Sequence, residues 1–208
     1  MNIGIIGSGM IGGTVGPLWA KAGHRVLYAS RHPENLAQLV RDTGHGARAG
    51  SPAEAAAFGE AVLLAVPFGA TPDLGKAVGN ALRGKVVLDA GNPYPSRDGA
   101  VATEVLKSGR GSGPFTAAAL PGARVVRAFN SVYFEVLKRE AHRAGDQVGV
   151  PLAGDDADAL AVAEELVRDA GFDPVVVGGL ETSARFDVGT PVYNTGMSGP
   201  ALRRALGL

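Results

Sequence analysis

The feature that most restricts the fold of this chain is a glycine pattern near its start. Gly7, Gly9 and Gly12 have the spacing GxGxxG, directly after the apolar run at residues 3–6 and before a helical pattern. In dinucleotide-binding βαβ units, the first glycine permits a tight turn, the second lets the backbone approach a pyrophosphate, and the third allows close packing of helix on strand. The alternative is a glycine turn that is merely flexible, but such a turn would not require this spacing between a strand and a helix. We therefore predict a helix from Met10 to about Lys21, preceded by a phosphate-binding turn made of Gly7, Ser8, Gly9, Met10, Ile11 and Gly12.

The end of the second predicted strand indicates which dinucleotide the turn binds. NAD-specific sites place an Asp or Glu there to hold the ribose 2'-hydroxyl. This chain reads Ala29-Ser30-Arg31-His32, with a hydroxyl and a guanidinium but no acid. Because a guanidinium matches phosphate geometry whereas a carboxylate would repel it, we predict NADP(H). The alternative is that Arg31 is an ordinary solvated residue.

Short apolar runs alternate with longer helical patterns along the chain, which is typical of an α/β fold. We predict a Rossmann-type, doubly wound, mostly parallel sheet in one NADP-binding domain over residues 1–208, with residues 181–208 as a short C-terminal helical extension. A length of 208 residues suits one such domain. The predicted strands lie near 2–6, 24–29, 61–66, 85–89, 124–129, 149–153 and 174–178.

Local signals place several further helices. Pro33 suits the first turn of one helix, and Ser51-Pro52-Ala53-Glu54 has the pattern of a capping box. Residues 155–171 have an aspartate to cap the helix, one apolar face and a terminal Gly171. The stretch 91–121 is rich in Gly, Ser and Pro, so we expect long loops around one helix; a mobile lid and simple exposed looseness are equally good interpretations of it.

Composition excludes several classes of function. The 20 Lys and Arg balance the 20 Asp and Glu, so we expect neither nucleic acid nor a membrane surface as partner. The absence of Cys excludes thiolate catalysis and iron–sulfur clusters held by cysteine. The four His lack metal-site spacing, so we predict no metal. No 18-residue apolar run and no basic leader precede the fold, which favours a cytoplasmic location.

Five motifs together resemble a known family. They are GIIGSGMIGG at the start, ASR at 29–31, LLAVPF at 63–68, LDAGNP at 88–93 and VVRAFNSV at 125–132. This set is similar to the NADP-dependent oxidoreductases that work with the deazaflavin coenzyme F420. The cytosolic reductase domain of six-transmembrane metalloreductases has similar motifs and uses FAD instead. The segment from Thr190 to Leu206 resembles the C-terminal helix of the family.

The resemblance implies roles for individual residues. Ser30 and Arg31 would bind the 2'-phosphate, and Asn35 stands where the family can carry a Lys, which makes His32 the candidate to compensate. The residues expected around the ribose and nicotinamide are Ala65, Val66, Pro67 and Phe68, with Asn92 and Pro93 beside the ring, Ala128, Phe129 and Asn130 beneath it, and Phe129, Pro191 and Met197 at the pocket of the second substrate. Without the resemblance, Val66-Pro67 is equally a strand end, and Asn92-Pro93 or Asn130 equally turn chemistry.

The function that these expectations imply is hydride exchange between NADP(H) and a flat, small-molecule acceptor, either coenzyme F420 or FAD or FMN. Direct transfer requires two rings to be held together, so no catalytic side chain is predicted. Two alternatives are a carbonyl or imine reductase, for which about 30 residues after the last strand are too few to form the usual helical domain, and an NADP-sensing module without turnover. Because the second pocket would lack a complete lid, we expect a homodimer.

Overall fold

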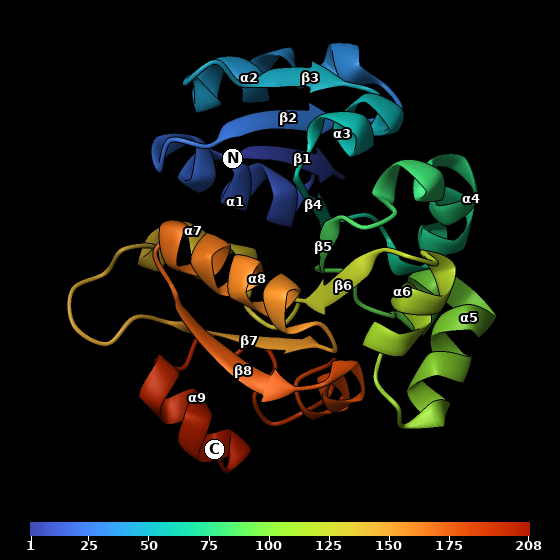
Figure 1. Ribbon diagram of the computed structural model, residues 1–208. Coiled ribbons are helices and arrows are strands. Elements are labelled where there is room, and N and C mark those ends of the chain that lie inside the picture. Colours follow the sequence, from blue (N-terminus) through green and yellow to red (C-terminus); the bar gives the residue numbers. More distant parts are fainter.

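One eight-stranded sheet forms the centre of the molecule (Figure 1). The computed structural model describes residues 1–208. The sheet has the order β3-β2-β1-β4-β5-β6-β7-β8, and only the β6–β7 pair is antiparallel. The chain builds from β1 to one edge and then returns to the other side of β1, which confirms the doubly wound, Rossmann-type fold. The strands are β1 (Asn2–Ile6), β2 (Arg25–Ala29), β3 (Arg48–Gly50), β4 (Ala61–Leu64), β5 (Val86–Asp89), β6 (Arg124–Arg127), β7 (Gly149–Gly154) and β8 (Asp173–Gly178).

Helices cover both faces of the sheet. On one face lie α1 (Met10–Lys21), α7 (Phe134–Glu140) and α8 (Ala157–Asp169). On the other lie α3 (Pro52–Phe58), α4 (Thr71–Leu82) and α6 (Gly113–Ala119), while α9 (Gly199–Leu206) packs on β7 and β8. The remaining elements are α2 (Ala37–Thr43), α5 (Pro95–Ser108) and the 3-10 turns η1 (Pro33–Leu36), η2 (Phe68–Ala70) and η3 (Leu180–Arg185).

The largest part of the core lies between the sheet and the helices α1 and α8. Ile3, Ile5 and Trp19 are fully buried there, and the Trp19 indole donates a hydrogen bond of 2.7 Å to the carbonyl of Leu166. A second apolar cluster fills the space under α3, α4 and α6. Alternate residues of the central strands point into these two clusters, as expected for a parallel sheet covered on both faces.

Local helix signals are confirmed. Helix α1 has the predicted bounds, Met10–Lys21. At the start of α3, the Ser51 hydroxyl accepts from the Glu54 amide at 3.2 Å, and the Glu54 carboxylate accepts from the Ser51 amide at 2.7 Å. Helix α8 begins at a capping residue as expected, since the Asp156 carboxylate accepts from the Ala159 amide at 2.9 Å. These signals succeed because each cap is completed within one turn of chain.

The helices and strands differ from the sequence prediction in three places. The short edge strand β3 was not predicted, because three residues carry no readable alternation. Residues 91–121 contain two helices, α5 and α6, each with a proline in its first turn, and α5 kinks at Gly99, which has φ 64°. Strands β4 and β6 end at Leu64 and Arg127, earlier than predicted. In both cases the residues that follow leave the sheet and shape the site described below.

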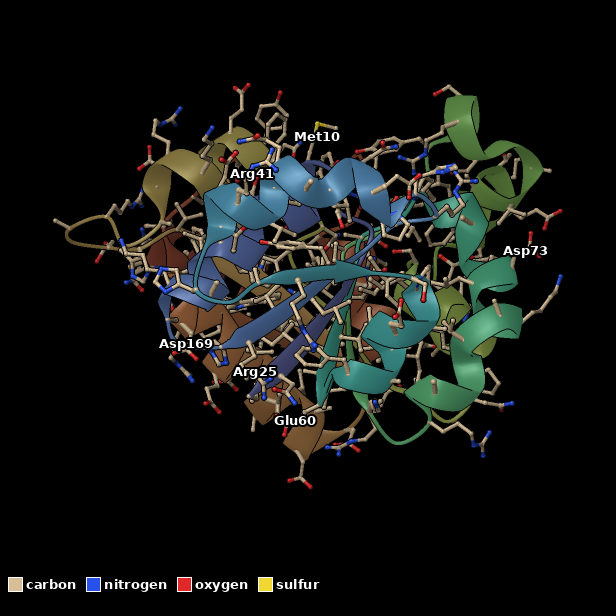
Figure 2. The ribbon with its side chains drawn as sticks, turned by 90° about the horizontal axis from the view of Figure 1, so that it is seen from above. Met10, Arg25, Arg41, Glu60, Asp73 and Asp169 are labelled. Carbon is tan, nitrogen blue, oxygen red and sulfur yellow. The ribbon has the colours of Figure 1, made fainter.

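Charges of both signs are spread over the surface. Figure 2 shows labelled side chains of both signs on this side of the molecule, with Met10 near the upper edge of the view. None of the helices has both the length and the apolar character needed to span a membrane. The structure contains no group of three or more His, Cys, Asp or Glu side chains placed to hold a metal ion.

Candidate functional site

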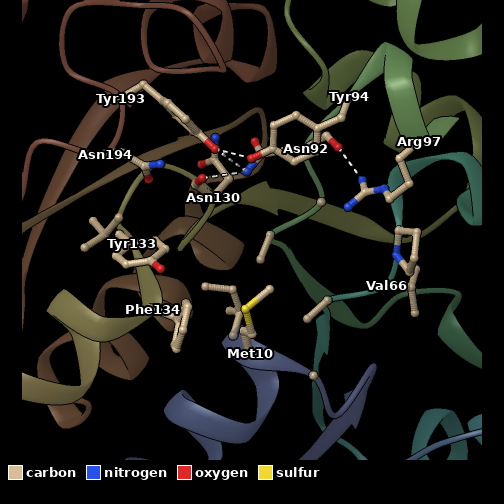
Figure 3. Close-up of a pocket in the computed structure, with 17 residues that line it drawn as sticks. Met10, Val66, Asn92, Tyr94, Arg97, Asn130, Tyr133, Phe134, Tyr193 and Asn194 are labelled. Atoms are coloured by element: carbon tan, nitrogen blue, oxygen red, sulfur yellow. Dashed lines mark hydrogen bonds between the residues drawn. The ribbon is translucent and has the colours of Figure 1, made fainter. Parts of the chain in front are cut away.

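A cleft of about 340 Å³ opens where β1, β4, β5 and β6 end (Figure 3). Its position is the point at which the strand order reverses between β1 and β4, where doubly wound sheets bind their ligands. Segments far apart in the chain meet there. The cleft is lined by Gly9, Met10, Ile11, Ala65, Val66, Pro67, Ala90, Gly91, Asn92, Tyr94, Arg97, Asn130, Val132, Tyr133, Phe134, Tyr193 and Asn194.

The three glycines of the turn after β1 have three different environments. Gly7 has φ 103°, and a Cβ placed on it would lie 2.4 Å from the Ala65 carbonyl oxygen. A Cβ on Gly12 would lie 2.1 Å from the Gly7 carbonyl oxygen, whereas a Cβ on Gly9 would meet no atom within 4 Å. Packing therefore requires Gly7 and Gly12 to lack side chains. Gly9 instead leaves open space above the backbone, as close approach of a diphosphate requires.

The start of α1 also suits an anion. Its N-cap residue, Gly9, provides no side-chain cap, and the first turn contains no acidic residue. The first amides of the helix and the positive end of its dipole are therefore available to a ligand. The Ser8 hydroxyl donates to the Ala29 carbonyl at 3.0 Å and so joins the turn to the end of β2. These features fit the diphosphate of a dinucleotide.

The residues predicted to bind a 2'-phosphate follow β2, outside the lining of the cleft. Arg31 is exposed and forms no ion pair, so its guanidinium is available to an anion. The Ser30 hydroxyl accepts from the His32 amide at 3.0 Å. The His32 ring is 3.2 Å from the Glu34 carboxylate, and Asn35 is exposed. Glu34, an exposed acidic residue, lies between His32 and Asn35 in the chain and places a negative charge within this group.

The residues after β4 have two different environments, and the change occurs at Phe68. Ala65, Val66 and Pro67, which the resemblance assigns to the ribose and nicotinamide, line the cleft. Phe68 is fully buried, and its ring packs against that of Phe115 with a centroid separation of 4.7 Å. The Phe68 side chain therefore packs in the interior, where it stabilises η2, and does not contact the cleft.

Two asparagines face the cleft from neighbouring strand ends. The Asn92 side-chain amide donates to the Asn130 carbonyl at 2.7 Å, and both residues line the cleft. The side-chain oxygens of Asn92 and Asn130 are buried and have no hydrogen-bond partner. Buried acceptors are rarely left unpaired in proteins, so these oxygens are suited to a ligand that donates hydrogen bonds, as a carboxamide does. Pro93 is buried and lines a separate small pocket.

A left-handed residue turns Asn130 toward the cleft. Phe129 has φ 59°, an unusual value for a bulky residue. Its ring lies in the core, at centroid separations of 5.8 Å from Trp19 and 6.3 Å from Phe172. Phe129 and Ala128 are both fully buried. Phe129 therefore cannot touch a second substrate, contrary to its predicted position, and of these three residues only Asn130 lines the cleft.

The C-terminal segment reaches the cleft through other residues than those predicted. Pro191 is exposed outside the lining, and Met197 packs against the apolar cluster between α9 and the sheet. Tyr193 and Asn194 line the cleft instead, and the Asn194 amide donates to the Ser131 carbonyl at 2.8 Å. The resemblance indicated the segment, but the residues that face inward depend on its turns.

Sequence reasoning missed five of the side chains that line the cleft. Tyr94 and Tyr193 come from opposite sides of the cleft, and their hydroxyls form a hydrogen bond (Figure 3). The Arg97 guanidinium lies 5.0 Å from the centre of the Tyr94 ring. No spacing motif includes these positions; the local signals are that Tyr94 follows Asn92-Pro93 and that Tyr133 and Phe134 follow the motif at 125–132. The five are Tyr94, Arg97, Tyr133, Phe134 and Tyr193.

A buried network of ion pairs lies behind the residues that line the cleft and contacts Asn130. The fully buried Arg127 guanidinium contacts carboxylate oxygens of Asp89 and Asp187, each at 2.8 Å. Burial alone would lower the pKa of Arg127, but the carboxylates of Asp89 and Asp187 outweigh it and raise that pKa above its ordinary value. Asp187 also accepts from the Asn130 side-chain amide at 3.2 Å. The network therefore fixes the orientation of Asn130 and the beginning of the C-terminal segment.

Comparison with known proteins relates the chain to one family of oxidoreductases. Residues 2–93 match the family model described as NADP oxidoreductase, coenzyme F420-dependent. The chain is 30% identical over 205 residues to the F420-dependent NADP reductase of Methanothermobacter thermautotrophicus, covering 92% of this chain and 87% of that protein. It is 27% identical over 185 residues to metalloreductase STEAP3 of Rattus norvegicus, but spans only 35% of that protein's length.

Solved structures show the same relationship. A hypothetical protein from Sinorhizobium meliloti has a TM-score of 0.81 and 27% identity, with 95% of each chain covered. A putative F420-dependent NADP-reductase from Arthrobacter has a TM-score of 0.76 and 25% identity, covering 88% of this chain and 86% of that one. An imine reductase from Bacillus cereus shares the fold, with a TM-score of 0.63 at 20% identity over 56% of its own chain.

Proposed function

Because this chain belongs to the family of coenzyme F420-dependent NADP oxidoreductases and is an NADP-dependent oxidoreductase, we propose that it exchanges hydride between NADP(H) and a deazaflavin or flavin. The observation that carries this proposal is one continuous cleft with two unlike ends. Gly9 and Met10 form the anion-binding end, and Tyr94 and Tyr193 form an aromatic, polar end. A dinucleotide and a second flat molecule can therefore meet between them.

The residues at the first end have defined tasks. Gly9 and the start of α1 would hold the diphosphate, and Ser30 and Arg31 would hold the 2'-phosphate. When bound, NADPH supplies a hydride. The unpaired side-chain oxygens of Asn92 and Asn130 would accept from the carboxamide and so orient the nicotinamide ring.

Near Met10, the aromatic side chains of Tyr133 and Phe134 line the side of the cleft opposite Val66 (Figure 3). Flat apolar walls position an aromatic substrate and exclude water, which protects a hydride during transfer. No carboxylate or histidine lines the cleft. The contribution of the chain is therefore positioning and hydrogen bonding, with no side chain assigned as general acid or base.

The test mixes the purified protein with NADPH and, in separate reactions, coenzyme F420, FMN, FAD or cyclohexanone with an amine. The absorbance near 340 nm reports oxidation of NADPH. We expect oxidation with coenzyme F420 or a flavin. Oxidation only with the carbonyl mixture would replace the proposal by a carbonyl or imine reductase, and tight NADPH binding with no oxidation by any acceptor would indicate a sensing module.

We also propose that two copies of the chain associate and help to close the cleft. Met10 and Tyr133 at its rim are large apolar side chains with 67% and 44% of their surface exposed. Covering such side chains is favourable. Analytical ultracentrifugation at micromolar concentration should give the mass of a dimer, and a monomer would contradict this proposal.

A further inference from the structure

Arg97 is the only charged residue among those that line the cleft. It lies in the first turn of α5, and Figure 3 shows its guanidinium directed toward the cleft. Its side chain is 43% exposed, so a ligand in the cleft can reach it. Because no carboxylate shares the lining, the charge of Arg97 favours a ligand with an anionic group over a neutral one.

Several contacts hold the Arg97 guanidinium in one orientation. Its Nε donates to one oxygen of the Asp98 carboxylate at 3.0 Å, and its Nη2 donates to the other oxygen at 2.8 Å. Nη2 also donates to the Asn92 carbonyl at 2.7 Å, and the Tyr94 ring lies beside the guanidinium. Two parallel bonds to one carboxylate fix the plane of a guanidinium. Arg97 therefore presents its charge at a defined place in the cleft.

The third nitrogen of the guanidinium, Nη1, has no hydrogen-bond partner in the protein. The bonds from Arg97 to Asp98 and Asn92 use Nε and Nη2 alone. The Asp98 carboxylate is 2% exposed and also accepts from the amides of Gly69 and Tyr94, at 3.1 and 3.0 Å. The charge of Asp98 is thus satisfied in the interior. Both N–H groups of Nη1 are therefore available to a ligand.

The dinucleotide does not require this donor. In the proposed function its diphosphate lies at Gly9 and its 2'-phosphate at Arg31, which is outside the lining of the cleft. We propose that Nη1 of Arg97 binds a phosphate group carried by the second substrate. The inference rests on the proposed function, whose acceptors FMN, FAD and coenzyme F420 all carry a phosphate on the chain attached to the flat ring. It narrows the substrate class to a flat conjugated ring with a phosphorylated side chain.

The competing interpretation is that Arg97 only fastens η2 to the start of α5. Its partner Asp98 joins the Gly69 amide of η2 to the Tyr94 amide, so the loss of Arg97 would disturb the cleft even without a phosphate contact. A fastening role predicts weaker binding of every ring to the same extent. A phosphate-binding role predicts weaker binding only of ligands that carry the phosphate. FMN and riboflavin separate these roles, because they have the same ring and differ by one phosphate.

The experiment measures the dissociation constants of FMN and riboflavin for the protein saturated with NADP⁺, followed by the fluorescence of the ring. Arg97→Met should weaken FMN binding about tenfold, because a charge-assisted hydrogen bond is lost, and riboflavin binding less than about threefold. Arg97→Lys keeps the charge without the planar fork, so its FMN binding should lie between those of Arg97→Met and the wild type. Arg139→Met is the matched control and should change neither constant, because Arg139 also pairs with the next residue, Glu140, at 2.7 Å, and lies outside the lining of the cleft.

Equal affinity of the wild-type protein for FMN and riboflavin, or equal losses for both ligands in Arg97→Met, would overturn the inference. Weaker NADPH binding in Arg97→Met with unchanged FMN binding would also overturn it, because Arg97 would then serve the cofactor. Coenzyme F420 and the same deazaflavin with an unphosphorylated chain provide a second pair with the same expected outcomes. If the wild-type protein binds the rings without oxidising NADPH, the proposed function fails, while the ratio of the two dissociation constants still decides the role of Arg97. Thermal melting of the three variants checks that all of them fold.

Discussion

The two ends of the cleft are built in different ways. The anion-binding end comes from neighbouring residues, since Gly7, Gly9 and Gly12 lie in one turn between β1 and α1. The far end combines Asn92, Asn130 and Tyr193 from segments that lie 38 to 101 residues apart in the chain. A local site can be recognised from residue spacing, whereas an assembled site depends on the packing that brings distant segments together. We call the glycine turn the local end and the group of Asn92, Asn130 and Tyr193 the assembled end. The two ends should respond differently to substitution.

The largest effect on stability is expected at the buried ion pairs of Arg127, next to the assembled end. Arg127→Met would leave the carboxylates of Asp89 and Asp187 buried without their cation. Removing one partner of a buried ion pair costs about 3–5 kcal/mol, because the remaining charge is uncompensated. Urea denaturation should show this loss in the free energy of unfolding.

Arg110→Met is the control for that measurement. Arg110 and Glu181 form an ion pair in which both side chains are 67% exposed, so its loss should cost less than about 1 kcal/mol. Equal losses for the two variants would show that the buried network does not support the assembled end as described.

The second effect concerns the choice of cofactor at the local end. Arg31→Glu replaces a free guanidinium by a carboxylate that would repel a 2'-phosphate. Charge-assisted hydrogen bonds are worth about 1.5–3 kcal/mol, so NADPH should bind about tenfold to 100-fold more weakly, while NADH binding stays nearly unchanged. Isothermal titration calorimetry measures both ligands. Arg41→Glu makes the same charge change on α2 and should leave both affinities as they are, and equal weakening of NADPH and NADH in Arg31→Glu would refute the assignment.

Two glycines of the local end should separate packing from binding. Gly12→Ala places a methyl group against the Gly7 carbonyl and should cost about 1–3 kcal/mol in stability. Gly9→Ala meets open space, so its stability should change by less than about 0.5 kcal/mol. The methyl group would instead weaken NADPH binding about tenfold by occupying the space of the diphosphate. Gly79→Ala, which also meets no atom within 4 Å, should leave binding unaffected.

The smallest effect is expected at a local element that touches neither end. Ser51→Ala removes the side-chain half of the capping box of α3. Loss of such a cap costs about 1 kcal/mol, which thermal denaturation can detect. NADPH affinity should not change, and a change would mean that α3 helps to position the site through β1 or β2, the strands it packs against.

The same contrast explains which parts of the molecule could be predicted. The glycine turn, the bounds of α1 and the capping box at Ser51 were readable, because each is completed within a few residues. The three-residue strand β3 was missed, and only one helix was expected where α5 and α6 lie, because these sequences are short or rich in Gly and Pro. The family resemblance supplied the overall chemistry, including positions such as Val66 and Asn130 that line the cleft.

The orientation of individual side chains was harder to predict. Phe129 belongs to a motif that suggested a position at the cleft, but its left-handed backbone sends the ring into the core. Tyr193 lies outside the five motifs, in the C-terminal segment that the resemblance indicated, where the backbone amide of the next residue, Asn194, is hydrogen-bonded to the Ser131 carbonyl. Such orientations depend on dihedral angles and long-range contacts, which residue spacing does not encode.

The most direct test of the account is a crystal structure of the protein with NADP⁺ and coenzyme F420 bound together. The electron density should show the diphosphate over Gly9, the 2'-phosphate beside Arg31, and the deazaflavin ring next to the nicotinamide in the same cleft. A dinucleotide that binds away from the glycine turn, or a deazaflavin that does not share the cleft with the nicotinamide, would contradict it.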